Sequence, residues 1–255
     1  MLKMFNEKYK IDNFEVSYSS YYRIFKTCNL KFKQPSADTC ATCDELVTQL
    51  KCVKTETEKI KLKEKHELHL RKADAAYQLK REMKSAAKDS ESVRRLIFDL
   101  EQVFSTPSVT CGKAYYLRQL SVYNLTIVDS KTNVTSNYMW HKGEAGRGAT
   151  EIASCLYKHF MDEVPNTVTH VNLCSDCCTG QNRNSIIAGM FQIVLALHPS
   201  IKQIDHVFLV PGHTRLECDS RHSRIEAKKN KAGLISVPSG WYELVSSVGE
   251  KYNVI

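Results

Sequence analysis

The chain has 255 residues, of which 42% are hydrophobic, and a formal net charge of +8. This size and apolar content can fill the core of one large domain, or of a core domain with a small appendage. No run of about 18 apolar residues occurs, and the N-terminus lacks the apolar stretch of a secretory signal, so we expect neither a membrane span nor secretion. The ten cysteines are then reduced thiols or metal ligands rather than a disulfide framework.

The positive charge is concentrated in one segment. Residues 51–95 contain 14 Lys or Arg against 8 Asp or Glu, a net charge of +6. One interpretation is a solvated helix whose mixed charges support it through neighbours three and four residues apart. The other is a surface that faces nucleic acid, since basic side chains release counterions from phosphate. The two interpretations are compatible.

The first third of the chain is predicted to be mainly helical. Residues 21–30 have an aromatic and apolar character that fits a helix or a strand, and residues 34–39 indicate a loop. From Asp44 onward the pattern predicts one long helix, because apolar residues recur near helical spacing and no Pro or Gly occurs before Pro107.

Cysteines and histidines in this region predict a metal site. Cys40 and Cys43 form a Cys-x-x-Cys pair, which can place two thiolates on one tetrahedral ion. His66 and His69 lie three apart on the predicted helix and therefore share a face, so they could complete a structural zinc shell. The 22 residues between Cys43 and His66 exceed the usual finger spacing, and the alternative is that one or both histidines sit on a polar helix face. Two more thiols are spare candidates, Cys28 and Cys52.

The composition changes near Ser90, where the lysine-rich pattern ends. We place a domain boundary there, between a basic helical segment with the zinc site (1–92) and a second domain (93–255), which could be a fragment that lacks C-terminal elements. The elements predicted in the second domain are a buried strand over 96–98, hairpin strands over 114–128 and 134–140, a helix over 146–160, a strand over 168–176, a helix over 185–197, a strand over 207–210 and a late helix after residue 216.

This order of strand, hairpin, helix, strand, helix, strand and helix is an α/β layer plan. Two of the strands end on an acid, at Asp99 and at Asp176. A carboxylate at the end of a buried strand is unfavourable unless a cation pairs with it. A mixed sheet flanked by helices, with acids in these positions and another in a late helix, is the layout of the ribonuclease H fold.

Clustered carboxylates of this kind can bind two divalent ions, which hold the attacking and leaving oxygens in phosphoryl transfer. Mg²⁺ or Mn²⁺ would suit the all-oxygen ligand set. Adjacent parallel strands would bring the two strand-end acids together at one sheet edge. For the third acid we choose Asp219, which shares a helix face with His222, ahead of Glu217 and Glu226.

Polar residues near these acids are further candidates, each with a structural alternative. His213 could be a general acid or base near neutral pH, or a hydrogen-bonded structural imidazole. Arg147 could contact phosphate or remain solvent-exposed. Asn182 and its neighbours could orient a phosphate or a water, or could cap the following helix. The candidates for substrate contacts are Gln181, Asn182, Arg183 and His222.

Several strings carry a resemblance to a known group of proteins. They lie at 96–103, 116–124, 140–148, 175–184 and 212–222, with weaker likeness at 38–44 and 69–73. Together they resemble a large group of uncharacterised animal proteins, abundant in arthropods, that derive from DNA transposons and carry a transposase-like ribonuclease H domain of unassigned function. Each string alone is weak, and the combination is specific.

The resemblance implies that Asp99, Asp176 and Asp219 stand at the positions of the transposase acidic triad. The chain would then be a metal-dependent nuclease or strand-transfer domain in the nucleus, with DNA favoured over RNA and a homo-oligomer as one option. One departure stands out, because the group usually has Asn after the middle acid and this chain has Cys177, a weaker donor. A catalytically inactive module that binds nucleic acid or protein is therefore the alternative.

A third hypothesis places zinc in the second domain. Cys174 and Cys177 form another Cys-x-x-Cys pair, which could close on Cys218, or on His213 and His222, as a structural zinc site or a zinc hydrolase. It leaves the acid at the end of the first strand unexplained.

Overall fold

The computed structural model describes residues 2–8, 16–28, 39–109 and 119–255, which divide into two compact units, Met1–Thr39 and Cys40–Ile255. The first unit holds helices α1 (Leu2–Lys8) and α2 (Tyr18–Thr27), so the aromatic segment that fitted either structure is helical where it is described. The expected loop up to residue 38 and the start of the expected hairpin, 114–118, lie outside the described residues. None of the described helices combines the length and hydrophobicity that a membrane span needs.

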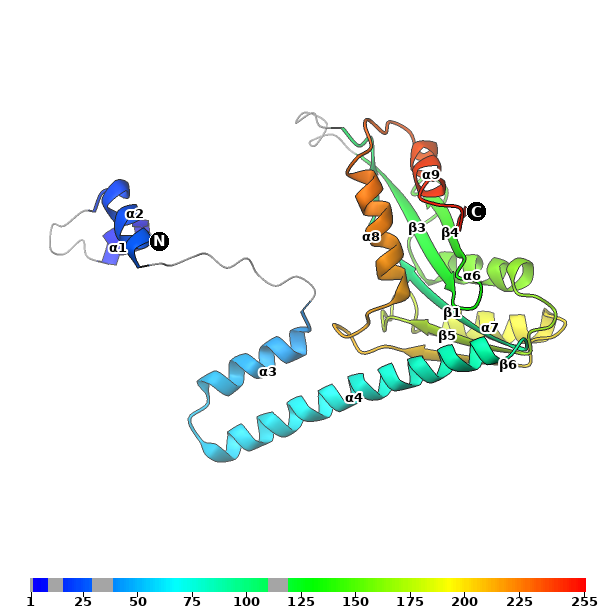
Figure 1. The fold of residues 1–255 in the computed structure, drawn as a ribbon, viewed down its shortest axis with the longest axis horizontal. Helices are drawn as coiled ribbons and strands as arrows, with labels where there is room; N and C mark the ends of the chain where they lie inside the picture. Colours follow the sequence, from blue (N-terminus) through cyan, green and yellow to red (C-terminus); the bar gives the residue numbers. More distant parts are fainter. Residues whose placement is uncertain (1, 9–15, 29–38, 110–118) are drawn as a thin grey trace. The chain divides into compact units, whose positions relative to one another are not determined.

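The long helix expected from Asp44 is two helices, α3 (Ala41–Cys52) and α4 (Glu56–Asp89). The backbone is extended at Val53, with ψ of 134°, and α3 folds back beside α4 (Figure 1). Neither Pro nor Gly marks this break, and its one sequence signal is the capping-box pattern of Thr55 and Glu58 at the start of α4.

The compact units do not divide near Ser90, where we expected a boundary. The end of α4 packs against the sheet, because Met83 is buried in one core cluster with Ile97 and Val128. Burial of this helix end joins α3 and α4 to the α/β part of the chain.

The remaining elements form an α/β structure with one mixed sheet, as the sequence predicted. They are β1 (Val93–Leu100), β2 (Phe104–Thr106), β3 (Leu120–Asp129), β4 (Thr135–His141), α6 (Ala149–Glu163), β5 (His170–Ser175), α7 (Ser185–Leu197), β6 (Gln203–Phe208), α8 (Glu217–Lys229), α9 (Pro238–Ser246) and β7 (Tyr252–Val254). The strand order is β6-β5-β1-β3-β4-β7, with β2 paired to β3. β1 runs antiparallel to β3 and parallel to β5, which is parallel to β6. The strand expected over 207–210 lies earlier, and the short β2, α9 and β7 were not predicted.

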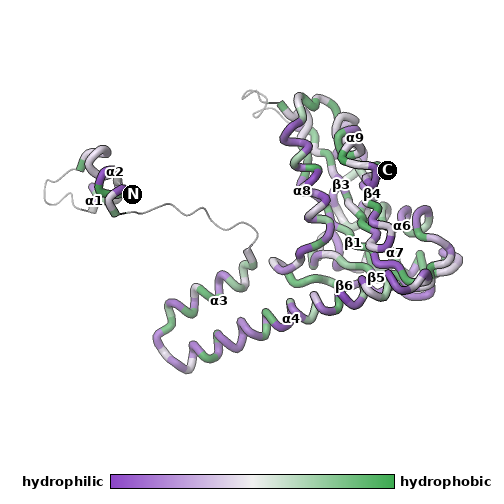
Figure 2. The backbone as a smooth tube through the Cα atoms, in the orientation of Figure 1, coloured by the Kyte–Doolittle hydropathy of each residue, from purple (hydrophilic) through white to green (hydrophobic). Residues whose placement is uncertain are grey.

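Helices cover both faces of the sheet. Leu96 and Phe98 of β1 are buried in the cluster that α6 and α7 complete. Ile97, between them, belongs to the opposite cluster, with Cys218 of α8. Successive strand side chains point to opposite faces, so Asp99 lies on the α8 side with Ile97. Figure 2 shows a largely hydrophilic α4.

Candidate functional site

Two strand-end acids line one cavity. Ile97 of β1 pairs with Cys174 of β5 in parallel register, and two residues further on the same register brings Asp99 beside Asp176. A cavity of about 380 Å³ opens there, and we call it the acid pocket. Its lining residues are Asp99, Asp176, Cys177, Cys178, Pro211, Gly212, Thr214 and Leu216.

The first turn of α8 carries the third acid, Asp219, whose charge acts on Asp99. Cys218 is fully buried and its Sγ lies 3.6 Å from the carbonyl oxygens of Ile97 and Thr126, which fixes the start of α8 on β1 and β3. Burial, then the negative charges of Asp176 and Asp219, raise the pKa of Asp99 to about 7. The three acids therefore repel one another, and a cation would relieve that repulsion.

Asp176 is held in place by its own loop. Its Oδ1 accepts a hydrogen bond of 3.2 Å from the backbone of Cys178 and another from the side-chain amide of Asn182. Asn182 is buried, and its Oδ1 has no hydrogen-bond partner among the described residues. The cap of α7 is Asn184, which accepts from Ile187, so Asn182 is an orienting residue for Asp176 rather than a helix cap.

The other polar candidates lie around the pocket at different depths. His222 Nδ1 is 4.0 Å from Asp99 Oδ2, and burial lowers the pKa of His222 to about 4, so the ring is neutral at neutral pH. Arg183 is exposed, and its Nη1 lies 3.4 Å from Cys177 Sγ. Gln181 is half-buried in the same turn.

Glu217, a candidate third acid, is already paired. Its Oε1 lies 3.0 Å from Nη1 of the fully buried Arg95, and its Oε2 lies 2.9 Å from Nζ of Lys80. Burial alone would raise the pKa of Glu217. The two cations outweigh burial and hold this pKa below its usual value. Glu226 pairs with Lys229 at 3.0 Å. Among the three acids of α8 that we considered, Asp219 is the one whose charge acts on Asp99.

A second cluster combines two thiols and two imidazoles. Its members are Cys40, Cys43, His69 and His213, one ligand atom of each lies within 4.8 Å of the others, and the group could bind a metal such as zinc. We call it the Cys/His cluster. His213 takes the place that we expected for His66, which lies outside the group, as do the exposed Cys28 and Cys52. His213 is 170 residues from Cys43, so no local spacing could reveal it.

The zinc site hypothesised at Cys174 and Cys177 has no matching group of ligands in the described part of the chain. The Cys/His cluster is the one group of three or more possible ligands there whose atoms all lie within 4.8 Å. Cys174 and Cys177 therefore form no such group with Cys218 or with the two histidines, and the three acids are spaced more widely as well. Cys174 and Cys218 are buried in the core, and burial raises the pKa of both thiols. Thiols buried in this way are chemically inert.

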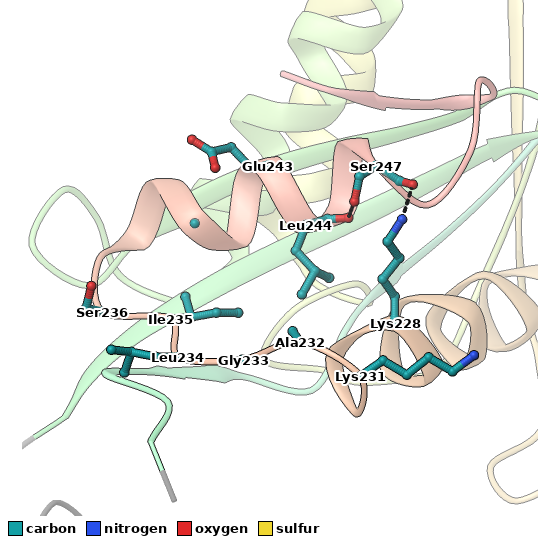
Figure 3. Close-up of a pocket in the computed structure, with 11 residues that line it drawn as sticks. Lys228, Lys231, Ala232, Gly233, Leu234, Ile235, Ser236, Glu243, Leu244 and Ser247 are labelled. Atoms are coloured by element: carbon teal, nitrogen blue, oxygen red, sulfur yellow. Dashed lines mark hydrogen bonds between the residues drawn. The ribbon is translucent and has the colours of Figure 1, made fainter.

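A larger cavity, of about 560 Å³, lies between the end of α8 and α9 (Figure 3). Lys228 and Lys231 contribute cations to its lining, and Glu243 is the single acid there. Lys228 already donates to the backbone oxygen of Ser247. None of the residues that we predicted for a site lines this cavity.

Fold and side chains thus define an α/β protein with an acid-lined pocket next to a Cys₂His₂ cluster. No family model matches the chain. A search of curated proteins found no match either. The function is therefore argued from the two sites themselves.

Proposed function

We propose that the chain is a metal-dependent nuclease or strand-transfer domain that acts on nucleic acid phosphodiesters through Asp99, Asp176 and Asp219. The observation that carries the proposal is the cavity that Asp99 and Asp176 line at the ends of two neighbouring parallel strands, where burial and the charges of the other acids also raise the pKa of Asp99 to about 7. A structural role would favour a paired or solvated carboxylate. Perturbed acids in a cavity are instead typical of functional sites.

The strand arrangement supports the proposed ribonuclease H-like fold. The described elements follow the predicted order of strand, hairpin, helix, strand, helix, strand and helix, with short additional elements. β1 lies between the antiparallel β3 and the parallel β5, so the acid of β1 and the acid after β5 end at one sheet edge. The two acids of this edge belong to strings that carry the resemblance to transposon-derived proteins.

The donor set fits hard divalent ions. Asp99, Asp176 and Asp219 offer oxygen ligands alone, which suit Mg²⁺ or Mn²⁺ rather than soft metals. Bound there, such ions would hold the attacking and leaving oxygens of a phosphodiester. Because the three acids are spaced more widely than the Cys/His cluster, water and substrate phosphate would complete the coordination.

Other residues would position the substrate and the acids. The positive charge of Arg147 acts on Asp99, which makes this side chain a candidate for a phosphate contact. Asn182 orients Asp176, and the neutral His222 beside Asp99 can donate or accept a hydrogen bond. The exposed lysines of α4 would bind the nucleic acid backbone outside the pocket.

A catalytically inactive binding module is the second candidate, and Cys177 favours it. This residue lines the acid pocket directly after Asp176, where the resembling proteins usually have Asn. A thiol donates a weaker hydrogen bond than an amide, so the pocket lacks one strong donor beside the metal ligands.

A cleavage assay separates the two candidates. We expect the full chain to cleave single- or double-stranded DNA, or RNA, when Mg²⁺ or Mn²⁺ is present, and Asp176→Asn to abolish the cleavage. Asp162→Asn is the matched control, because Asp162 is an exposed acid of α6 that pairs with Lys158 at 2.7 Å. Salt-sensitive binding without cleavage by the unmodified chain would reject the nuclease and support the binding module.

A further inference from the structure

The Cys/His cluster joins three segments that are distant in sequence. Cys40 precedes α3 and Cys43 lies in its first turn, His69 lies on α4, and His213 lies in the loop between β6 and α8. Residues 209–216 of this loop are called the pocket loop. Two of the three segments belong to α3 and α4, which together are called the helical arm, and the third is part of the α/β structure.

The distances in the cluster fit a tetrahedral zinc site. Cys40 Sγ lies 3.2 Å from His69 Nε2, and Cys43 Sγ lies 3.4 Å from His213 Nε2. With Zn–S near 2.3 Å and Zn–N near 2.0–2.1 Å, a tetrahedral ion separates a sulfur from a nitrogen by about 3.5 Å. Two thiols and two imidazoles are also the commonest ligand types of structural zinc, and all four positions are filled by protein.

The backbone of the pocket loop lies very close to the backbone at Cys40. Gly212, next to His213, has φ of +76°, and a Cβ at this position would lie 2.5 Å from Cys40 Cα. Only glycine lets the pocket loop reach the start of α3 this closely. The same loop is attached to α4 a second time, because Lys80 Nζ donates to the carbonyl oxygen of Arg215 and the Arg215 guanidinium lies 5.9 Å from the Tyr77 ring centroid.

The pocket loop is also one wall of the acid pocket. Pro211, Gly212, Thr214 and Leu216 all line that cavity together with Asp99 and Asp176. His213 is absent from the lining, and its Nε2 faces Cys43 instead. The pocket loop therefore borders the acid pocket on one side and the Cys/His cluster on the other.

We propose that Cys40, Cys43, His69 and His213 bind one structural zinc ion, which fixes the helical arm to the α/β domain and holds the pocket loop in place. The ion does not enter the acid pocket. Its role is positional, and it is independent of whether the acids catalyse phosphoryl transfer. Loss of zinc should release the pocket loop and the start of α3 together.

The test measures metal content and ligand type on the full chain. We expect about one equivalent of zinc per chain by mass spectrometry of the metal, in keeping with one four-ligand site. His213→Ala and Cys43→Ser should lose it, whereas His66→Ala should keep it, since His66 lies three residues before His69 on the same helix but outside the cluster. Retention by His213→Ala together with loss in His66→Ala would overturn the assignment.

A second measurement covers the case in which a variant does not fold. Cobalt substituted into the unmodified chain should show the intense visible bands of a tetrahedral site and a thiolate charge-transfer band. Removing the metal with a chelator should accelerate proteolysis at residues 209–216, with unchanged cleavage between α6 and β5 as the internal reference. Octahedral cobalt spectra, or a metal-free folded chain with unchanged proteolysis at residues 209–216, would reject the proposal.

Discussion

Arg95 Nη1 lies 3.0 Å from Glu217 Oε1, and the Arg95 side chain is fully buried. This pair connects the central strand β1 to the first turn of α8, two residues before Asp219. Lys80 of α4 contacts the same carboxylate at 2.9 Å, so Glu217 joins three elements through its charge. The Glu217 carboxylate therefore has a structural role, with two cations beside it, whereas the neighbours of Asp99 include two other acids.

Glu217→Gln should destabilise the protein without acting directly on the acid pocket. Removing this charge leaves the buried Arg95 uncompensated, and breaking such a pair destabilises by about 3–5 kcal/mol when both partners are buried. Because the Glu217 side chain is 27% exposed, we expect about 2–4 kcal/mol. Urea unfolding measures it, and Asp162→Asn, which removes an exposed acid of α6 paired with Lys158, is the control, with a change within about 0.5 kcal/mol. Equal losses in both variants would contradict this interpretation.

Asp99→Asn should stabilise the metal-free protein at alkaline pH. The carboxyl pKa is about 7 in the folded protein against 3.8 as the ordinary value, so the folded state binds more protons between these pH values. The stability contribution of Asp99 therefore falls as the pH rises from about 4 to above 7. At pH 8 we expect the Asn variant to be more stable by about 2–4 kcal/mol, and at pH 4 the difference should vanish.

The comparison must separate Asp99 from Glu101. Burial raises the pKa of Glu101 to about 8, with Glu226 and Asp99 adding to the shift, so Glu101 contributes a slope of the same sign. Subtracting the pH profile of Asp99→Asn from that of the unmodified chain removes most of the Glu101 contribution and leaves that of Asp99 together with its effect on the pKa of Glu101. A difference that does not change with pH would be incompatible with a raised pKa at Asp99.

Divalent metal binding at the acid pocket should strengthen as the pH rises towards neutrality. Below pH 7 the Asp99 carboxyl is mostly protonated, and a proton competes with the ion for the same oxygen. We expect the affinity for Mn²⁺ to increase up to about tenfold per pH unit between pH 5.5 and 7 and to level off above pH 8. Titration calorimetry on the zinc-loaded chain measures it, with Asp176→Asn as the control that removes the site. A pH-independent affinity would contradict ligation by Asp99.

Gly212→Ala should disrupt the contact between the pocket loop and α3. A side chain in the left-handed region costs about 1–2 kcal/mol, and here the added Cβ also meets the Cys40 backbone at 2.5 Å. We expect a stability loss of about 2 kcal/mol or more and weaker zinc retention against a chelator. Gly233→Ala is the matched control, because a Cβ there meets nothing within 4 Å. Strong zinc retention with unchanged stability in Gly212→Ala would count against the close approach.

Exposed lysines of α4 should contribute a salt-dependent part of nucleic acid binding. Lys61, Lys63 and Lys65 are exposed on this helix. If they contact phosphates, replacing all three by Ala should weaken DNA binding and reduce the salt slope by about 0.9 for each lost contact. Fluorescence anisotropy at several salt concentrations measures the slope. An unchanged slope would assign α4 to the solvated-helix interpretation.

Much of the fold followed from local pattern. The apolar run over 185–197 gave α7 with the predicted bounds, and the α/β alternation was confirmed. The break between α3 and α4 did not follow, because no Pro or Gly lies at it, and β2, α9 and β7 are too short to show a period. Periodicity relates residues a few positions apart and can be recognised only when it recurs. Long elements therefore show it and short ones do not.

For the candidate sites, the sequence alone determined the chemistry and the tertiary structure decided the partners. Cys40 and Cys43 were recognisable as candidate metal ligands because their spacing is local, and Asp99 and Asp176 as candidate site acids because each follows an apolar strand. That His213 rather than His66 joins the cysteines, and that Glu217 pairs with Arg95 while Asp219 remains with the acids, depends on the packing of α4 and α8 against the sheet. Contacts between segments more than a hundred residues apart are set by that packing, and no spacing along the chain encodes them.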